Sequence, residues 1–365
     1  MVSAVIPDIV VIGGGVAGLS CAAALGDRAR VTVVEAELQP GYHASGRSAA
    51  VYIEPYINAT VHALTVASLP YHQATGARPI GDFMIADAAH ADLLDAYLAR
   101  WQPLCPTLRE ADPEALRRQV PILRPAAVAR VVEDPRTLAL DVHGLQDGYR
   151  RRLLAAGGRL LCPARVIGLK RHRGRWHITL DPSGLTLQAD VIVNAAGAWG
   201  DAVGVLAGAR PLGLMPLRRT AVLLDPGLDV RGWPMVHRIE GGLYFKPEGG
   251  VLMASLADET ESAPCDAQPD ELDLARLIDR FESVTTVVVR RPGRAWAGLR
   301  TFLPDQLPAV GFDPEVPGLF WLVGQGGFGM QTSPALSALA ATVLLSGDHP
   351  LAAALSPRRL AGAVA

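Results

Sequence analysis

The feature that most constrains the fold is a glycine-rich turn that follows the first apolar run of the sequence. Residues 9–12 are apolar and lead directly into Gly13, Gly15 and Gly18, and an alanine-rich stretch continues to about residue 25. A buried strand, a tight turn of small residues and a helix, in this order, are typical of the start of a parallel α/β sheet. We therefore expect the core to begin with a strand–turn–helix unit.

A second apolar run, residues 31–34, ends in Glu35 and completes a strand–helix–strand unit. In such a unit Gly13 permits the tight turn, Gly15 lets a pyrophosphate approach the backbone, and Gly18 lets the helix pack on the strand. The free N–H groups at the helix N-terminus favour phosphate. Glu35 is placed to bind both hydroxyls of an adenosine ribose and disfavours a 2′-phosphate. The unit predicts a site for FAD or NAD rather than NADP. The alternative, a glycine turn that merely opens a helix, leaves the second strand and its acid unexplained.

Composition restricts the class of protein further. With 365 residues, 50% of them hydrophobic, the chain is long enough for two domains, and a formal net charge of −2 argues against nucleic-acid binding. No apolar run reaches the length of a membrane span, and the start lacks the basic segment of a signal peptide. We expect a cytoplasmic protein without an integral membrane segment; peripheral contact with the inner membrane face stays open. The cysteines are isolated and predict neither a metal site nor disulfides: Cys21, Cys105, Cys162 and Cys265.

The rest of the chain alternates between helical and strand patterns. Helices are predicted at residues 61–73, 88–101, 113–120, 141–156 and 269–284, with a closing helix that ends at 345. Strands are predicted at residues 81–86, 160–169, 176–180, 186–188, 190–199 and 319–323. No flexible linker separates two halves, so both domains are expected to be discontinuous. The cofactor domain is assigned residues 1–57, 141–210 and 292–365, and the substrate domain residues 58–140 and 211–291.

Several motifs in this order resemble the FAD-dependent D-amino-acid oxidase/glycine oxidase superfamily, and the nearest resemblance is to bacterial D-arginine dehydrogenases and related D-amino-acid dehydrogenases. The motifs are residues 39–50, 194–199, 207–213, 239–247, 296–300 and 325–333. The resemblance implies an α/β fold in which a glutathione-reductase-type, Rossmann-like FAD domain is interwoven with a substrate domain built on a mixed β-sheet.

The same resemblance implies an activity. A D-amino acid would be oxidised by hydride transfer from Cα to flavin N5, and the imino acid would be hydrolysed to a 2-oxo acid and ammonia. Two alternatives remain open. One keeps FAD but acts on glycine, an N-alkyl amino acid or a 2-hydroxy acid, and the other is a non-catalytic flavin subunit that only transfers electrons.

The resemblance also assigns roles to single residues. Arg300 would grip the substrate carboxylate bidentately, as a planar guanidinium can, Tyr244 would add its phenol, and Tyr56 would act as a lid. Arg219 would lie in the substrate pocket, whereas its neighbour Arg218 is expected to face solvent. The competing interpretations are a surface arginine for Arg300 and core packing for the two tyrosines. The remaining substrate contacts assigned by the resemblance are Val51, Phe83 and Gly327.

The FAD contacts are implied by the glycine turn and by the matching loops, in part through backbone and amide donors at the flavin's pyrimidine end. They are Gly13, Gly15, Gly18, Glu35, Ala44, Ser45, Gly46, Arg47, Ser48, Ala49, Ala50, Val166, Ala196, Gly197, Trp199, Arg300, Gly326, Gly327, Phe328, Gly329, Met330, Gln331 and Thr332. Residues 301–305 contain no cysteine where some relatives attach their flavin, so FAD is expected to be non-covalent.

The departures from the family pattern concern specificity. Val51 replaces a histidine, and the family's acidic residue aligns with Phe83 or, allowing a shift, with Asp82. We therefore expect a small-molecule D-amino acid with a broad or apolar side-chain range. Solvent or His237 would accept the substrate's ammonium proton. The absence of lysine from residues 249–255 favours a quinone or another carrier over O₂ as the electron acceptor.

Overall fold

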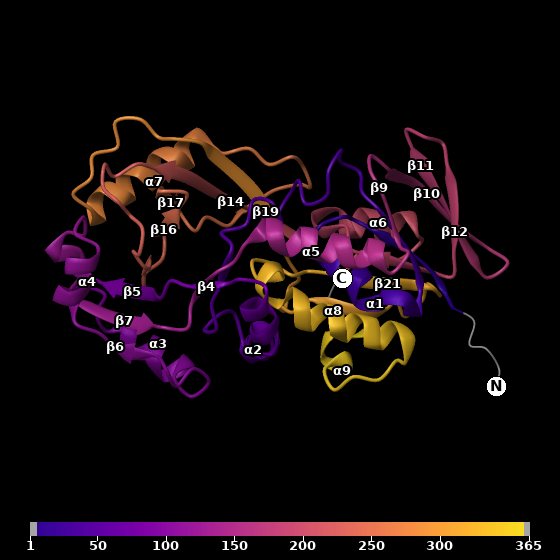
Figure 1. Cartoon of the computed structure of the whole chain (residues 1–365), viewed down its shortest axis with the longest axis horizontal. Helices are drawn as coiled ribbons and strands as arrows, with labels where there is room; N and C mark the ends of the chain where they lie inside the picture. Colours follow the sequence, from indigo (N-terminus) through magenta and orange to yellow (C-terminus); the bar gives the residue numbers. More distant parts are fainter. Residues whose placement is uncertain (1–5, 361–365) are drawn as a thin grey trace.

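The computed structural model describes residues 6–360, which form two lobes (Figure 1). The first lobe is built on a six-stranded sheet in the order β20-β21-β13-β1-β2-β9, in which only β20 is antiparallel to its neighbour. Its strands are β1 (Asp8–Ile12), β2 (Arg30–Val34), β9 (Arg159–Leu161), β13 (Val191–Asn194), β20 (Ala309–Phe312) and β21 (Leu319–Val323).

Helices cover one face of this sheet. Helix α1 (Val16–Leu25) packs against α5 (Val142–Ala155) and α8 (Gly329–Leu345), and the three enclose the largest hydrophobic core. Helix α1 lies close to β1 because Gly18 has no side chain; a Cβ there would be 1.9 Å from the Gly13 carbonyl oxygen. Helix α5 begins at Asp141, whose carboxylate accepts a hydrogen bond from the Gly144 N–H, as the sequence predicts for an N-cap.

An antiparallel three-stranded sheet covers the other face, together with α6 (Gly200–Leu206). Its strands are β10 (Arg165–His172), β11 (Arg175–Asp181) and β12 (Thr186–Ala189). Because side chains alternate along a strand, Val11 faces the helices while Val10 and Ile12 face the small sheet. This three-layer arrangement is the glutathione-reductase-type organisation that the resemblance implies, and the expected fold class is confirmed.

The second lobe is a nine-stranded mixed sheet, with β15 and β5 parallel and the other pairs antiparallel. Helix α7 (Glu271–Val284) packs on one face and buries Leu277 and Phe281 in the second core. The strands are β5 (Asp82–Ala86), β6 (Arg109–Glu110), β7 (Arg130–Asp134), β14 (Met215–Leu224), β15 (Met235–Arg238), β16 (Tyr244–Glu248), β17 (Val251–Ser255), β18 (Thr260–Glu261) and β19 (Ala295–Phe302).

The lobes are joined by several crossings. Helix α2 (Ala59–Ala74), assigned to the substrate domain, packs against α8 of the first lobe. The remaining elements are β3 (Val51–Tyr52), β4 (Arg78–Pro79), β8 (Leu138–Ala139), α3 (Leu93–Trp101), α4 (Pro113–Gln119) and α9 (Ala352–Leu355). Short 3₁₀ turns lie at Gly26–Arg28, Pro125–Ala127, Gly197–Trp199 and Pro357–Leu360.

Two segments differ from the sequence assignment. Helix α2, assigned to the substrate domain, contributes Leu64 to the core of the first lobe. Residues 295–302 are assigned to the cofactor domain, but β19 pairs along its whole length with β14 and so lies in the nine-stranded sheet. Residues 1–5 and 361–365 of the assigned cofactor domain lie outside the described residues. Between residues 6 and 360, no helix combines the length and apolar character that a membrane crossing requires.

Candidate active site

A cavity of about 740 Å³ extends from the glycine turn of the first lobe to the sheet of the second. Its walls come from the β1–α1 turn, the loop before β3, the strand end at Ala195–Trp199, strands β14–β17 and β19, and the loop that opens α8. A cavity of this size is ample for a cofactor or ligand. Both lobes therefore contribute to one continuous site.

The glycine end of the cavity fits a dinucleotide. Gly15 is the N-cap residue of α1, and a Cβ placed on it would meet only the Ser45 hydroxyl, at 3.1 Å, so the space beside its backbone is open to a ligand. Glu35 also lines the cavity, at the end of β2, and its carboxylate accepts hydrogen bonds from the N–H groups of Gly14 (2.6 Å) and Glu37 (2.9 Å). An open glycine backbone at a helix N-terminus beside a strand-end acid meets the requirements of pyrophosphate and ribose.

The loop before β3 is held rigidly beside this turn. The Ser45 hydroxyl accepts a hydrogen bond from the Val16 N–H at 2.9 Å. The Arg47 guanidinium lies partly in the cavity wall but donates to the carbonyl oxygens of Ala267 and Ala297, both at 2.9 Å. Arg47 therefore connects the loop to the second lobe, and its charged group is already paired on the protein side.

Most of the expected cofactor contacts line the cavity. They are Gly13, Gly15, Glu35, Ala44, Ser45, Arg47, Ser48, Ala49, Ala50, Val166, Ala196, Gly197, Trp199, Arg300, Gly326, Gly327, Gly329, Met330 and Gln331. Four others do not line it. Gly18 and Gly46 are packed against the backbone oxygens of Gly13 and Gly41, whereas Phe328 and Thr332 are fully buried.

Gln331 differs from expectation in its chemistry. Its amide is not free to reach a flavin, because the side-chain oxygen accepts from the Ile53 N–H at 3.2 Å and the side-chain nitrogen donates to the Ile53 carbonyl at 3.0 Å and to Thr65 Oγ1 at 2.8 Å. Gln331 thus joins α8 to the segment after β3. The side-chain amide left at this end of the cavity is that of Gln325, whose Nε2 donates to the Leu322 carbonyl at 3.1 Å.

At the other end of the cavity lies the Arg300 guanidinium, on β19. Its Nη2 donates to the Tyr56 hydroxyl at 2.6 Å and its Nη1 to Glu259 Oε1 at 2.8 Å, and the group lies over the Phe302 ring. Burial by itself lowers the pKa of Arg300, but the neighbouring Tyr56 and Glu259 outweigh it, so the pKa ends above its ordinary value. Arg300 is a largely buried, permanently charged group, with a side chain 13% exposed, rather than a surface arginine.

Gly327 makes this position accessible. A Cβ on Gly327 would lie 2.4 Å from Arg300 Nε and Nη2 and 2.6 Å from the Tyr56 hydroxyl. Only glycine therefore lets the loop before α8 approach the guanidinium. Arg300, expected to bind the substrate carboxylate and called here the carboxylate clamp, therefore meets the expected FAD contacts before α8 at this residue.

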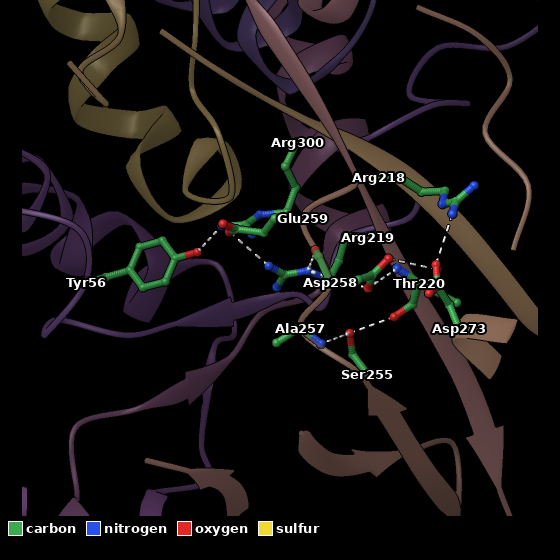
Figure 2. Close-up of polar contacts among 10 residues, drawn as sticks. All are labelled: Tyr56, Arg218, Arg219, Thr220, Ser255, Ala257, Asp258, Glu259, Asp273 and Arg300. Carbon is green, nitrogen blue, oxygen red and sulfur yellow. Dashed lines mark hydrogen bonds and ion pairs between the residues drawn. The ribbon is translucent and has the colours of Figure 1, made fainter. Parts of the chain in front are cut away.

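A second guanidinium, that of Arg219 on β14, faces the same cavity (Figure 2). It donates from Nε to the Asp258 carbonyl at 2.7 Å and from Nη2 to Glu259 Oε1 at 3.2 Å. Burial raises the pKa of the Asp258 carboxyl. Arg218, expected in solvent, instead lies on the opposite face of β14 and pairs with Asp273 of α7 at 2.9 Å.

Tyr244 lines the cavity beside an imidazole that faces it. The ring of His237 lies 5.1 Å, centroid to centroid, from that of Tyr244, and His237 Nδ1 donates to the buried Asp82 carboxylate at 2.8 Å. Asp82 therefore holds the imidazole on the side away from the cavity. The Asp82 carboxylate also acts on a second buried carboxyl: together with burial, it raises the pKa of Asp134 to about 6.

Phe83 corrects an expectation. It packs in the second core with Ile85 and the α7 side chains, and it does not line the cavity. Neighbouring residues of a strand point to opposite faces, so Asp82, the alternative that allowed a shift, is the one on the face of His237. Val51 lines the cavity as expected, within an apolar wall of Ile53, Ala221, Met235 and Met253.

Comparisons with known proteins agree with this geometry. The sequence profile of the DAO family, described as FAD dependent oxidoreductase, matches residues 8–343. Mouse mitochondrial dimethylglycine dehydrogenase is 25% identical over 380 residues, which cover 94% of this chain and 43% of that protein. D-amino acid dehydrogenase 3 of Mesorhizobium japonicum is 27% identical over 221 residues, 59% of this chain and 53% of that protein. The chain thus spans about half the length of these relatives.

Solved structures share the fold over nearly the whole chain. L-proline dehydrogenase from P. horikoshii superposes with a TM-score of 0.85 at 21% identity and covers 98% of both chains. Glycine oxidase from Geobacillus kaustophilus superposes with a TM-score of 0.82 at 20% identity and covers 96% of this chain and 98% of the other.

Proposed function

Because the chain belongs to the DAO family of FAD dependent oxidoreductases, we propose that it oxidises the C–N bond of amino acids, preferring D-amino acids with apolar side chains. The products would be a 2-oxo acid and ammonia. The observation that carries the proposal is the largely buried guanidinium of Arg300, hydrogen-bonded to Tyr56, in the same cavity as Gly13 and Gly15.

In this proposal the chain positions the substrate. Arg300 binds the α-carboxylate and Tyr56, at its Nη2, covers the site, so that Cα is held at the loop of Gly327. Gly13, Gly15 and Glu35 hold FAD, without a covalent bond because residues 301–305 contain no cysteine. Bound FAD supplies the hydride acceptor. Fixing a reacting carbon by a bidentate arginine removes much of the entropic part of the barrier.

The side-chain preference rests on the apolar wall. Ile53, Met235, Tyr244 and Met253 form one hydrophobic cluster that lines the cavity. Asp82, the acid that matches the family position when a shift is allowed, is hydrogen-bonded to His237 and is only 3% exposed. A cationic substrate side chain would therefore meet no free counter-charge there, whereas an apolar one gains about 25 cal/mol for each Å² that it buries.

The two named relatives support different substrates. The D-amino acid dehydrogenase supports the first candidate, and dimethylglycine dehydrogenase, which matches 94% of this chain, supports an N-alkyl amino acid as the second. The apolar wall accommodates either an apolar side chain or N-methyl groups. An electron acceptor other than O₂ remains part of the proposal, because residues 249–255 contain no lysine.

A substrate panel tests the proposal. Under anaerobic conditions, D-leucine, D-methionine and D-phenylalanine should bleach the flavin, with kcat/KM about tenfold or more above that of D-arginine, because a cation would lose solvation without a partner. L-leucine, dimethylglycine, glycine, L-proline and D-lactate complete the panel. Bleaching by dimethylglycine alone would select the second candidate, and bleaching by none would contradict both. Slow reoxidation on admission of air, accelerated by a quinone, is the expected acceptor result.

We further propose that His237 accepts the ammonium proton, since Asp82 holds its Nδ1 and Nε2 has no hydrogen-bond partner among residues 6–360. His237→Asn should lower kcat/KM about tenfold near neutral pH. The deficit should shrink as pH rises, because more substrate then arrives as the free amine. His90→Asn is the matched control, since His90 also contacts an aspartate, at 2.7 Å, but outside the cavity. A deficit that stays constant with pH would exclude this role.

A further inference from the structure

The carboxylate clamp already holds a carboxylate, and it belongs to the chain itself (Figure 2). Glu259 Oε1 accepts hydrogen bonds from Arg300 Nη1 at 2.8 Å and from Arg219 Nη2 at 3.2 Å. The Tyr56 hydroxyl accepts a hydrogen bond from Arg300 Nη2, so each terminal nitrogen of the guanidinium already has one partner. Each of these nitrogens keeps a second N–H, but a substrate carboxylate on Nη1 would lie against the Glu259 carboxylate, and like charges at close range repel. Close bidentate binding to Arg300 therefore favours a position of Glu259 away from Nη1.

The backbone around Glu259 is fixed. The preceding residue, Asp258, accepts hydrogen bonds from Thr220 N at 2.8 Å and Thr220 Oγ1 at 3.1 Å. Ser255 Oγ donates to the Thr220 carbonyl at 2.6 Å and accepts from the Ala257 N–H at 3.2 Å. The segment between β17 and β18 is therefore attached to β14, next to Arg219.

The Glu259 side chain, in contrast, is largely solvated. It is 54% exposed, whereas the side chains of Arg300 and Arg219 are 13% and 17% exposed. An ion pair with one solvated partner is weak, because water competes for the exposed carboxylate. Rotation of this side chain alone uncovers Arg300, and it needs no movement of the attached backbone.

The charges then determine which acids fit. With Glu259 on the arginines, two guanidiniums face the carboxylates of Glu259 and Asp258, so the group is balanced. A zwitterionic amino acid keeps that balance. A dicarboxylic acid adds a second negative charge beside Glu259 and Asp258, where Arg219 is already engaged, and like charges at close range repel.

We propose that Glu259 is a specificity-determining residue: it occupies the carboxylate clamp of the free protein, moves off Arg300 when substrate binds, and stays on Arg219 to exclude a second acidic group. This inference rests on the proposed function only in taking Arg300 as the carboxylate clamp. It assigns Arg219 to an internal carboxylate rather than to the substrate.

Equilibrium binding of acids that lack an amino group tests this without turnover. The flavin-loaded protein is titrated calorimetrically with 4-methylpentanoate and with glutarate, a monocarboxylate and a dicarboxylate of similar length. Glu259→Gln should tighten the binding of 4-methylpentanoate about fivefold, the upper range for a half-exposed ion pair, because competition for Arg300 is removed. It should tighten the binding of glutarate about thirtyfold, because repulsion of the second carboxylate is removed as well. Glu261→Gln is the matched control; it removes the same charge two residues along, from an exposed side chain outside the cavity.

The outcomes separate this inference from the proposed function. Equal tightening of the two acids, no tightening, or no binding of either acid by either protein overturns the role of Glu259. If D-leucine still bleaches the wild-type flavin in that case, the proposed function stands alone. If no amino acid bleaches the flavin but Glu259→Gln shifts the preference towards glutarate, the proposed function is wrong and the role of Glu259 stands.

Discussion

Replacing Arg300 by methionine is expected to lower kcat/KM for the best amino-acid substrate about a thousandfold, within the range observed when one partner of a buried charge pair is removed. Methionine preserves most of the side-chain volume but cannot donate to a carboxylate or to the Tyr56 hydroxyl. Arg300 is only one of the expected FAD contacts, and Gly13, Gly15 and Glu35 lie at the other end of the cavity, so FAD should remain bound. Stopped-flow reduction of the flavin and its absorbance spectrum measure the two properties separately.

The matched control is Arg218→Met. Arg218 lies on the strand that pairs with β19 and is also ion-paired, to Asp273 at 2.9 Å, but it does not line the cavity. Its loss should lower the free energy of unfolding while kcat/KM stays near that of the wild type. A similar loss of turnover in both variants would mean that Arg300 acts through stability. Near-normal turnover in Arg300→Met would mean that the carboxylate is bound elsewhere.

The nucleotide end of the site is predictable from sequence because its determinants are local. Gly13, Gly15 and Glu35 belong to one strand–helix–strand unit, and each requirement is a backbone or strand-end property that a short window encodes. The same holds for the Asp141 cap. Arg300, Tyr244 and Tyr56 are found differently, through motifs that resemble a family, and the structure brings all three to one cavity.

The misplaced residues depend on information that a local pattern lacks. Asp82 and Phe83 differ by one position, and one position reverses the face of a strand, so an uncertain alignment selects the wrong side chain. Gln331 lies in the first turn of α8, within the expected motif, but its amide is hydrogen-bonded to Ile53, far away in the sequence, and no motif encodes that partner.

Glu259 lies entirely outside what the sequence predicts. It meets Arg300 and Arg219 because β14 pairs with both β17 and β19, which brings three separate segments together. An exposed glutamate between two strands has no distinguishing pattern of its own. The sequence supports His237 only by proximity; its pairing with Asp82 follows from the parallel β15–β5 contact.

Gly15→Val is expected to weaken FAD binding at least about a hundredfold while the fold is retained. Gly15 has φ −73° and ψ −178°, an extended conformation that valine adopts readily, and its Cβ would contact only Ser45 Oγ at 3.1 Å. The valine methyl groups would instead fill the space next to the N-terminus of α1. If the pyrophosphate accepts two charge-assisted hydrogen bonds from backbone N–H groups at this turn, their loss, at about 1.5–3 kcal/mol each, would account for the magnitude.

Titration of the apoprotein with FAD, followed by flavin fluorescence, measures this change, and far-ultraviolet circular dichroism checks the fold. The control is Gly148→Ala in the interior of α5, where a Cβ meets no atom within 4 Å. It should leave FAD affinity unchanged and stabilise the helix by about 0.5–1 kcal/mol. If Gly15→Val folds and binds FAD as tightly as the wild type does, the pyrophosphate does not lie at this turn. The cofactor would then have to enter the cavity in another orientation, since Gly13, with φ +111° and a Cβ position 2.4 Å from the Ala195 oxygen, leaves no second opening there.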